Sequence, residues 1–266
     1  MRKYIFALVV LAGCVGGDEG DTISFDRPSI SEGAIALYDF APLDGDIQNR
    51  IVPDLTENGN DLFFGGEFDV DAEWVLDEED PLDNGIAFLD RTRLRSVRNM
   101  TNMTEACNDT SSVTIDVVAT SVGDLSAGTF VEFANQEGRG FRVRHNGTLI
   151  EALVSHGDEI NGSPQFASNS DIYGLVRNHI VVRSALGGAD VHVDLDRGET
   201  PRPGSDGPMN WDNEFELYVG NTFSNNDSLD LGTTLHRLAI YCGELTDEQL
   251  RANAASAGLE IPAEEE

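Results

Sequence analysis

The sequence predicts an all-β chain, folded as an antiparallel sandwich or barrel with one helix near its C-terminal end. Three observations lead to this prediction. Short runs of alternating apolar residues recur along the chain, glycine turn signals separate several of them, and only one segment carries helix signals. Parallel α/β folds need crossover helices between strands, and the sequence pattern contains none.

Six runs have the pattern of single or paired strands. They span residues 33–40, 112–121, 140–155, 179–196, 214–221 and 234–242. In the second run, Val113, Ile115 and Val117 would share one face of a strand. The third run contains Asn146-Gly147 and the fourth contains Gly187-Gly188. Both dipeptides predict tight turns, so each of these runs is expected to form a hairpin.

The helix is expected just after the last strand. Thr246 with Gln249 three residues later forms a capping box, and Gly258 supplies a C-terminal stop. Residues 259–266 are predicted to form a solvated acidic tail.

The N-terminus has the layout of an export signal. Arg2 and Lys3 precede an apolar run over 4–11, which as a helix would be about 12 Å long, against a hydrocarbon core of about 30 Å. The run is therefore too short to span a membrane and is typical of a signal peptide. An ordinary secretory signal ending in an incidental cysteine is the alternative.

The residues Leu11-Ala12-Gly13-Cys14 resemble the bacterial lipobox. This resemblance implies a signal peptide over 1–13, a lipid anchor on Cys14 and a flexible tether over 14–31. By analogy with better-studied bacterial lipoproteins, Val15 rather than Asp after the cysteine implies the outer membrane. We therefore expect a lipid-anchored protein of the cell envelope, at the outer membrane or cell surface.

Composition narrows the function. The net charge of −31 makes nucleic acid and anionic headgroups poor partners. Lys3 is the only lysine, which excludes lysine nucleophiles, Schiff bases and phosphate-loop lysines from the rest of the chain. A chain of 266 residues can bury a core without a metal or disulfide, and residues 32–258 are expected to form one domain.

Several segments together resemble laminin G-like domains of the concanavalin A-like superfamily. They are "EGAIALYDFAPLDGDIQNRI", "DNGIAFLDRTRLRSV", "TEACNDTSSVTIDVVA" and "LYVGNTFSNNDSLDLGTTLHRLAIYCGELTDEQLRANAASAG". The resemblance covers nearly all of the chain after the tether. It implies an antiparallel jelly-roll β-sandwich and non-catalytic binding of a glycan or protein.

The same resemblance pairs the two remaining cysteines. In the family topology the start of the 112–121 strand lies beside the end of the 234–242 strand, so Cys107 would face Cys242. An exported protein lives where disulfides persist, and the resemblance therefore implies a disulfide between them. Two buried free thiols are the alternative.

Calcium is the one candidate cofactor, because relatives of this family often bind it through loop oxygens. The candidate ligands are Asp39, Asn221, Asn225, Asp227 and Asp230, with Asn226, Asp44 and Asp46 as further oxygen donors of the same two loops. Solvated acidic loops are the alternative, and they are the favoured one in a chain this acidic.

No catalytic site is expected. Glu67, Asp69 and Asp71 resemble the carboxylate signature of family 16 glycoside hydrolases, which share the jelly roll. Residues four apart on a strand lie about 13 Å apart, whereas a retaining pair needs about 5–5.5 Å. The five histidines lack metal spacing and are expected to be ordinary strand or loop residues. An unusual glycosidase and a purely structural envelope protein stay open as alternatives.

The stretch "RTRLRSVR" places Arg91, Arg93 and Arg95 on one strand face. The favoured interpretation is a solvent face that neutralises nearby acids. Contact with an anion or a sugar acid is the alternative.

Overall fold

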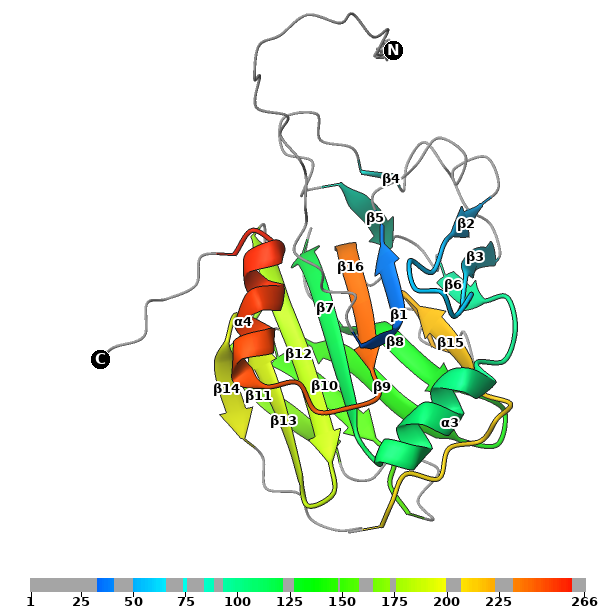
Figure 1. The fold of residues 1–266 in the computed structure, drawn as a ribbon. Coiled ribbons are helices and arrows are strands. Elements are labelled where there is room, and N and C mark those ends of the chain that lie inside the picture. The colour runs from blue at the N-terminus through cyan, green and yellow to red at the C-terminus, as the bar shows by residue number, and fades with distance from the viewer. Residues whose placement is uncertain are drawn as a thin grey trace, which may run out of the picture.

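A computed structural model shows the chain as two stacked antiparallel sheets (Figure 1). It describes residues 33–40, 50–65, 74–75, 84–88, 93–121, 127–147, 149–157, 165–172, 176–199, 207–222 and 232–259. The sandwich prediction is confirmed. The barrel alternative is wrong, because the strands form two separate sheets.

Sheet A contains the longest central strands. Its order is β14 (Asp196–Glu199), β13 (Gly188–Val193), β12 (Arg177–Ala185), β7 (Val113–Ser121), β16 (Thr233–Tyr241), β5 (Gly85–Phe88) and β4 (Trp74–Val75). A further strand, β1 (Ala34–Asp39), also pairs with β16. β5 pairs with the first residues of β16 and β1 with the later ones, so both lie along the edge opposite β7.

Sheet B is the second layer. Its order is β11 (Gln165–Asp171), β10 (Leu149–Val154), β9 (Arg139–Asn146), β8 (Ala127–Ala134), β15 (Glu216–Val219), β6 (Arg93–Ser96), β3 (Leu62–Gly65) and β2 (Ile51–Val52). All its described pairings are antiparallel.

The core fills the space between the sheets. Successive side chains of a strand point to opposite faces, so alternate residues of each strand enter this space. Ile115 and Val117 of β7 and Phe141 and Val143 of β9 are almost fully buried in one apolar cluster. The outer face of each sheet is therefore built from the intervening residues.

Both glycine hairpins form where the sequence predicts them. β9 and β10 are joined around Gly147, and β12 and β13 around Gly187. Each glycine has a positive φ, of 63° and 87° respectively, which a tight hairpin turn requires. Helix α4 (Asp247–Ser256) also forms as predicted, with both hydrogen bonds of the Thr246–Gln249 capping box present.

One helix was not predicted. α3 (Thr101–Thr110) precedes β7, whereas the sequence pattern predicts a helix only at the C-terminal end. Its N-cap, Met100, makes no side-chain capping bond. The helix is held by tertiary contacts instead: Met103 and Cys107 are fully buried, and Asn108 exchanges two hydrogen bonds with the backbone of Trp211.

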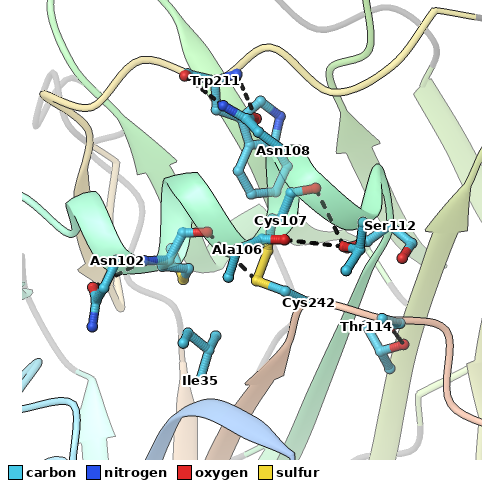
Figure 2. Close-up of a disulfide and its surroundings, with 12 residues drawn as sticks. Ile35, Asn102, Ala106, Cys107, Asn108, Ser112, Thr114, Trp211 and Cys242 are labelled. Carbon is cyan, nitrogen blue, oxygen red and sulfur yellow. Dashed lines mark hydrogen bonds between the residues drawn. A yellow bond between two sulfur atoms is a disulfide. The ribbon is translucent and has the colours of Figure 1, made fainter.

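A disulfide joins α3 to the segment just after β16 (Figure 2). It links Cys107 and Cys242, the two cysteines that the family resemblance pairs, over a separation of 135 residues. Close by, the Thr114 hydroxyl donates to the Gly243 carbonyl and accepts from the Leu245 amide. The disulfide therefore ties the helix before β7 to the segment between β16 and α4.

Helix α4 covers the outer face of sheet A (Figure 1). Leu250 packs in a small apolar cluster with Val181, Ala239 and Tyr241. Beneath the helix, the buried carboxylate of Asp116 contacts three partners from three different elements. They are His179 Nε2 at 3.0 Å, Asn253 Nδ2 at 2.6 Å and Arg237 Nη2 at 3.6 Å.

The expected signal peptide, the anchor on Cys14, the tether and the acidic tail all lie outside the described residues, apart from Leu259 at the start of the tail. In the part of the chain that the structure describes, no helix is long and apolar enough to cross a membrane.

Candidate ligand-binding face

One row of side chains crosses the outer face of sheet B. Directly opposed residues of antiparallel strands point to the same side of a sheet, so the strand register identifies the row. We call it the outer row, and it consists of Ile51, Phe63, Arg95, Tyr218, Glu132, Arg142 and Leu153. It brings together strands from β2 to β15 that are far apart in the sequence.

The alternation of each strand turns this row away from the core. Phe64 of β3, Leu94 of β6 and Leu217 of β15 belong to the main apolar cluster. Their neighbours Phe63, Arg95 and Tyr218 do not, and they point to the opposite side. Within the row Arg95 is exposed and Ile51, Phe63 and Arg142 are half-buried, whereas Tyr218, Glu132 and Leu153 are buried.

Two arginines of β6 stack on aromatic rings of the neighbouring strands. Arg95 Cζ lies 4.6 Å from the ring centroid of Phe63, and Arg93 Cζ lies 5.2 Å from that of Tyr218. Arg93 also donates to the Thr222 carbonyl at 3.1 Å. Cation–π contacts of this kind contribute about 0.5–1 kcal/mol where they are exposed. They hold the guanidinium groups against the sheet.

The glutamates of this face are engaged within the chain. Glu132 is fully buried and pairs with Arg139, and Glu216 accepts a hydrogen bond from the Tyr218 hydroxyl. Burial, and then Glu216, raises the pKa of Tyr218 above its ordinary value.

Glu151 is engaged too, through Arg144 and Asn146. Burial alone would raise the pKa of Glu151. Its hydrogen bonds from Asn146 and Arg144, with the charges of Arg144 and Arg142, bring that pKa below its ordinary value.

Arg95 is different. Its side chain is exposed, and among the described residues it pairs with no carboxylate; its contact is the ring of Phe63. The sequence pattern favours arginines that neutralise neighbouring acids, and for Arg95 the structure gives an aromatic support instead. Arg91, the third arginine of that stretch, lies outside the described residues.

The calcium candidates are described only in part. Asp39 ends β1 and Asn221 follows β15. Asn221 is buried, with its Oδ1 accepting from the Thr222 amide at 2.7 Å. The other candidates, Asn225, Asp227, Asp230, Asn226, Asp44 and Asp46, lie outside the described residues. Within the described ranges, no group of three histidine, cysteine or acidic residues could hold a metal ion. Calcium binding stays a prediction.

The remaining candidates do not add a site on the described surface. Glu67, Asp69 and Asp71 lie in segment 66–73, outside the described residues. All five histidines are buried, at exposures of 6% or less. His156 illustrates their internal contacts: its Nε2 lies 3.0 Å from the Ser184 hydroxyl and its Nδ1 lies 3.2 Å from the Gly207 carbonyl.

The sequence could indicate parts of the outer row but not the row itself. The arginine stretch of β6 and the hairpin of β9 and β10 were both visible. The register that places Arg95 between Phe63 and Tyr218 joins strands that are far apart in the sequence, and no local signal carries it.

No family model matches the sequence, and no curated protein matches it either. Solved structures match over most of the chain. One is a botulinum neurotoxin type C structure from a study of cell entry dependent on two ganglioside molecules, with TM-score 0.60 and 12% identity, covering 86% of this chain and 52% of that chain. Another is the receptor binding domain of a mosaic serotype C/D botulinum neurotoxin, with TM-score 0.59, 12% identity and coverage of 86% and 52%.

A third match is the Trypanosoma rangeli sialidase in complex with sialic acid, with TM-score 0.53, 11% identity and coverage of 83% of this chain and 32% of that chain. The chain thus spans about half the length of the toxin chains and a third of the sialidase. At these identities the likeness concerns the fold alone, and it agrees with an antiparallel jelly-roll β-sandwich.

Proposed function

We propose that this chain is a non-catalytic, laminin G-like binding module whose ligand is a glycan, and that the outer row is its binding face. One observation carries the proposal. In a chain of net charge −31, stacked arginines and aromatic rings lie side by side on the outer face of a sheet. Ligand sites commonly combine apolar and aromatic surface with a few fixed polar groups, and the outer row offers both.

The solved structures of similar fold are consistent with a glycan or a protein as the ligand, since one of them is a botulinum neurotoxin binding domain in complex with rat synaptotagmin II. The outer row is what favours a glycan here. One toxin structure concerns cell entry that depends on two ganglioside molecules, and the sialidase is in complex with sialic acid. A sandwich of this kind can therefore carry a glycan site, while the site of each protein depends on its own side chains.

A glycan array with the full chain in mild detergent tests the proposal, with and without calcium. We expect saturable binding to one class of glycan. A blank array from a well-folded sample would contradict the proposal and favour a protein ligand or a purely structural envelope role. Loss of binding on calcium removal would support a metal among Asp39, Asn221 and the residues of segment 223–231.

We also propose that the module is displayed at the cell envelope, anchored through lipid on Cys14. The basic residues, the short apolar run and the lipobox-like tetrapeptide support this. The Cys14→Ser variant should leave the membrane fraction, and a variant that stays there would overturn the anchor.

The absence of catalysis is part of the proposal. The double variant Glu67→Gln with Asp71→Asn tests it: if the wild-type chain hydrolyses a glycan and this folded variant does not, the chain is a glycosidase instead.

A further inference from the structure

The geometry points to a carboxylate-bearing sugar as the ligand of the outer row, with Arg95 as the residue that contacts the carboxylate. This inference rests on the proposed function, since it names the ligand class for the same face.

Arg95 is positioned for such a contact before any ligand arrives. Its guanidinium lies over the ring of Phe63, with 4.6 Å between Cζ and the ring centroid. A guanidinium supported on one side by a ring can still donate from its fork of N–H groups, and that fork matches the two oxygens of a carboxylate. The ring also limits the side chain's rotamers, which lowers the entropy lost when a ligand binds.

Arg95 also differs from the other charged residues of the face. Glu132, Glu151 and Glu216 each have a partner within the chain. Arg95 is exposed, and no carboxylate in the described part of the chain pairs with it. An arginine that only neutralised local charge would contact an acid, and acids are abundant here, at 48 in the chain. A carboxylate supplied by a ligand would complete its contacts.

Arg93 extends the same surface. It lies two residues before Arg95 on the same strand face, about 7 Å away by strand geometry. Its guanidinium lies over Tyr218, and it donates to the Thr222 carbonyl. Two cations supported by rings, with the half-buried ring of Phe63 beside them, suit a sugar ring that carries a negative substituent.

The negative charge of the whole chain means that only local contacts could bind an acidic sugar. A surface with net charge −31 repels anions at long range, so bulk electrostatics cannot draw an acidic sugar to this protein. Any binding of a sugar acid must come from local contacts within about a Debye length of a cationic group. Binding of such a ligand is therefore informative about individual arginines.

Titration calorimetry of the full chain in mild detergent tests this. The probes are sialyllactose, its carboxylate methyl ester and lactose, with a trigalacturonate and its methyl ester as a second kind of sugar acid. Arg95→Gln removes the cation, and Arg95→Lys keeps the charge without the planar fork. Arg251→Gln is the matched control, because it removes one arginine from α4, over the outer face of the other sheet.

We expect at least one of the two sugar acids to bind and its methyl ester or neutral counterpart to bind at least about tenfold more weakly, because a charge-assisted hydrogen-bond pair is lost. Arg95→Gln should weaken binding of the acid by about 10- to 100-fold and Arg95→Lys by less, while Arg251→Gln should bind as the wild type does.

Four results would overturn the inference. If acid and ester bind equally, or if Arg95→Gln binds the acid as tightly as the wild type, the outer row does not recognise a carboxylate, and the glycan-binding proposal can still stand on the array. If neither acid binds while the array shows a neutral glycan, the inference alone fails. If no glycan of any kind binds, both fail together.

Discussion

Asp54 joins β1 to the loop that precedes β3. Its two carboxylate oxygens accept hydrogen bonds from the backbone amides of Leu37, Thr56 and Asn60, at 3.0 to 3.1 Å, and from the Thr56 hydroxyl. Asp54 is 8% exposed. This one residue thus fixes β1 of sheet A against the loop that connects β2 and β3 of sheet B, the two strands at the end of the outer row.

We predict that Asp54→Ala lowers the free energy of unfolding by about 2–4 kcal/mol, because the Leu37 and Asn60 amides lose their acceptor in a buried setting. Urea denaturation measures this. Glu57→Ala is the control, since Glu57 is an exposed acid of the same loop and its removal should change stability by less than about 0.5 kcal/mol. Equal effects of the two substitutions would mean that charge reduction, not hydrogen bonding, is what matters.

Asp116 should make stability depend on acid pH. Burial alone would raise its pKa, but His179, Arg237 and Asn253 outweigh burial and lower the pKa to about 2 from an ordinary 3.8. Because the pKa is lower in the folded state, the stabilisation is fully present above about pH 4 and is lost as pH falls from about 4 to about 2. The amount is about 2 kcal/mol for a shift of this size.

Comparison with Asp116→Asn isolates this residue from the other carboxylates. Asparagine cannot ionise, so the gap in unfolding free energy between the wild type and the variant should narrow by about 2 kcal/mol as pH falls from about 5 to about 2. Urea denaturation at a series of pH values gives the gap. A gap that stays constant through that range would contradict the lowered pKa.

At the scale of elements, α4 is attached to sheet A by polar contacts as much as by apolar ones. The Asn253 side chain donates to Asp116, and the Asn253 carbonyl accepts from Arg237. Arg183 of β12 donates to both the Leu245 carbonyl and Asp247. On the same helix Glu248 is exposed, whereas Asn253 is buried. The two polar residues therefore occupy opposite environments on one helix.

We predict that Asn253→Ala destabilises the chain by about 2–3 kcal/mol, because it removes a donor from a buried carboxylate. Glu248→Ala is the control and should change stability by less than about 0.5 kcal/mol, since the residue is exposed and alanine is a good helix former. Thermal or urea unfolding of both variants, followed by circular dichroism, makes the comparison. If both substitutions were neutral, Leu250 and its apolar cluster would be enough to hold α4.

An element could be predicted from the sequence when the residues that stabilise it lie close together in the chain. The turn glycines of both hairpins and the capping box of α4 act within a few residues, and the sequence indicated all three. α3 lacks a side-chain cap and is held by its buried face, the Trp211 backbone and the disulfide, which are tertiary causes. β8 was missed because seven of its eight residues are buried, so its polar and apolar residues do not separate into two visible faces.

At the scale of the whole molecule, the fold class followed from repeated strand signals, while the candidate binding face did not. The segments of the laminin G-like resemblance indicated a jelly roll with its two sheets. The outer row depends on the register between β3, β6 and β15, which only the packed structure fixes. The overall acidic composition does not indicate this row, because the row's arginines and aromatic residues come from segments that are far apart in the sequence.

The disulfide acts on the whole chain. It joins residues 135 apart, and cross-linking so long a loop removes entropy from the unfolded state, by about 5 kcal/mol in the chain-entropy model and typically about 2–5 kcal/mol by measurement. The double variant Cys107→Ala with Cys242→Ala should therefore still fold, because a chain of this size buries enough surface, but with a free energy of unfolding lower by about 2–5 kcal/mol.

The urea m-value of this double variant should be higher than that of the oxidised wild type, since an unfolded chain without the cross-link exposes more surface. Wild-type protein unfolded under reducing conditions is the control and should behave as the double variant does. If the variant matched the oxidised wild type in both stability and m-value, the cross-link would not restrict the unfolded chain. If its stability fell with an unchanged m-value, the disulfide would act through packing of α3 against the end of β16 in the folded state instead.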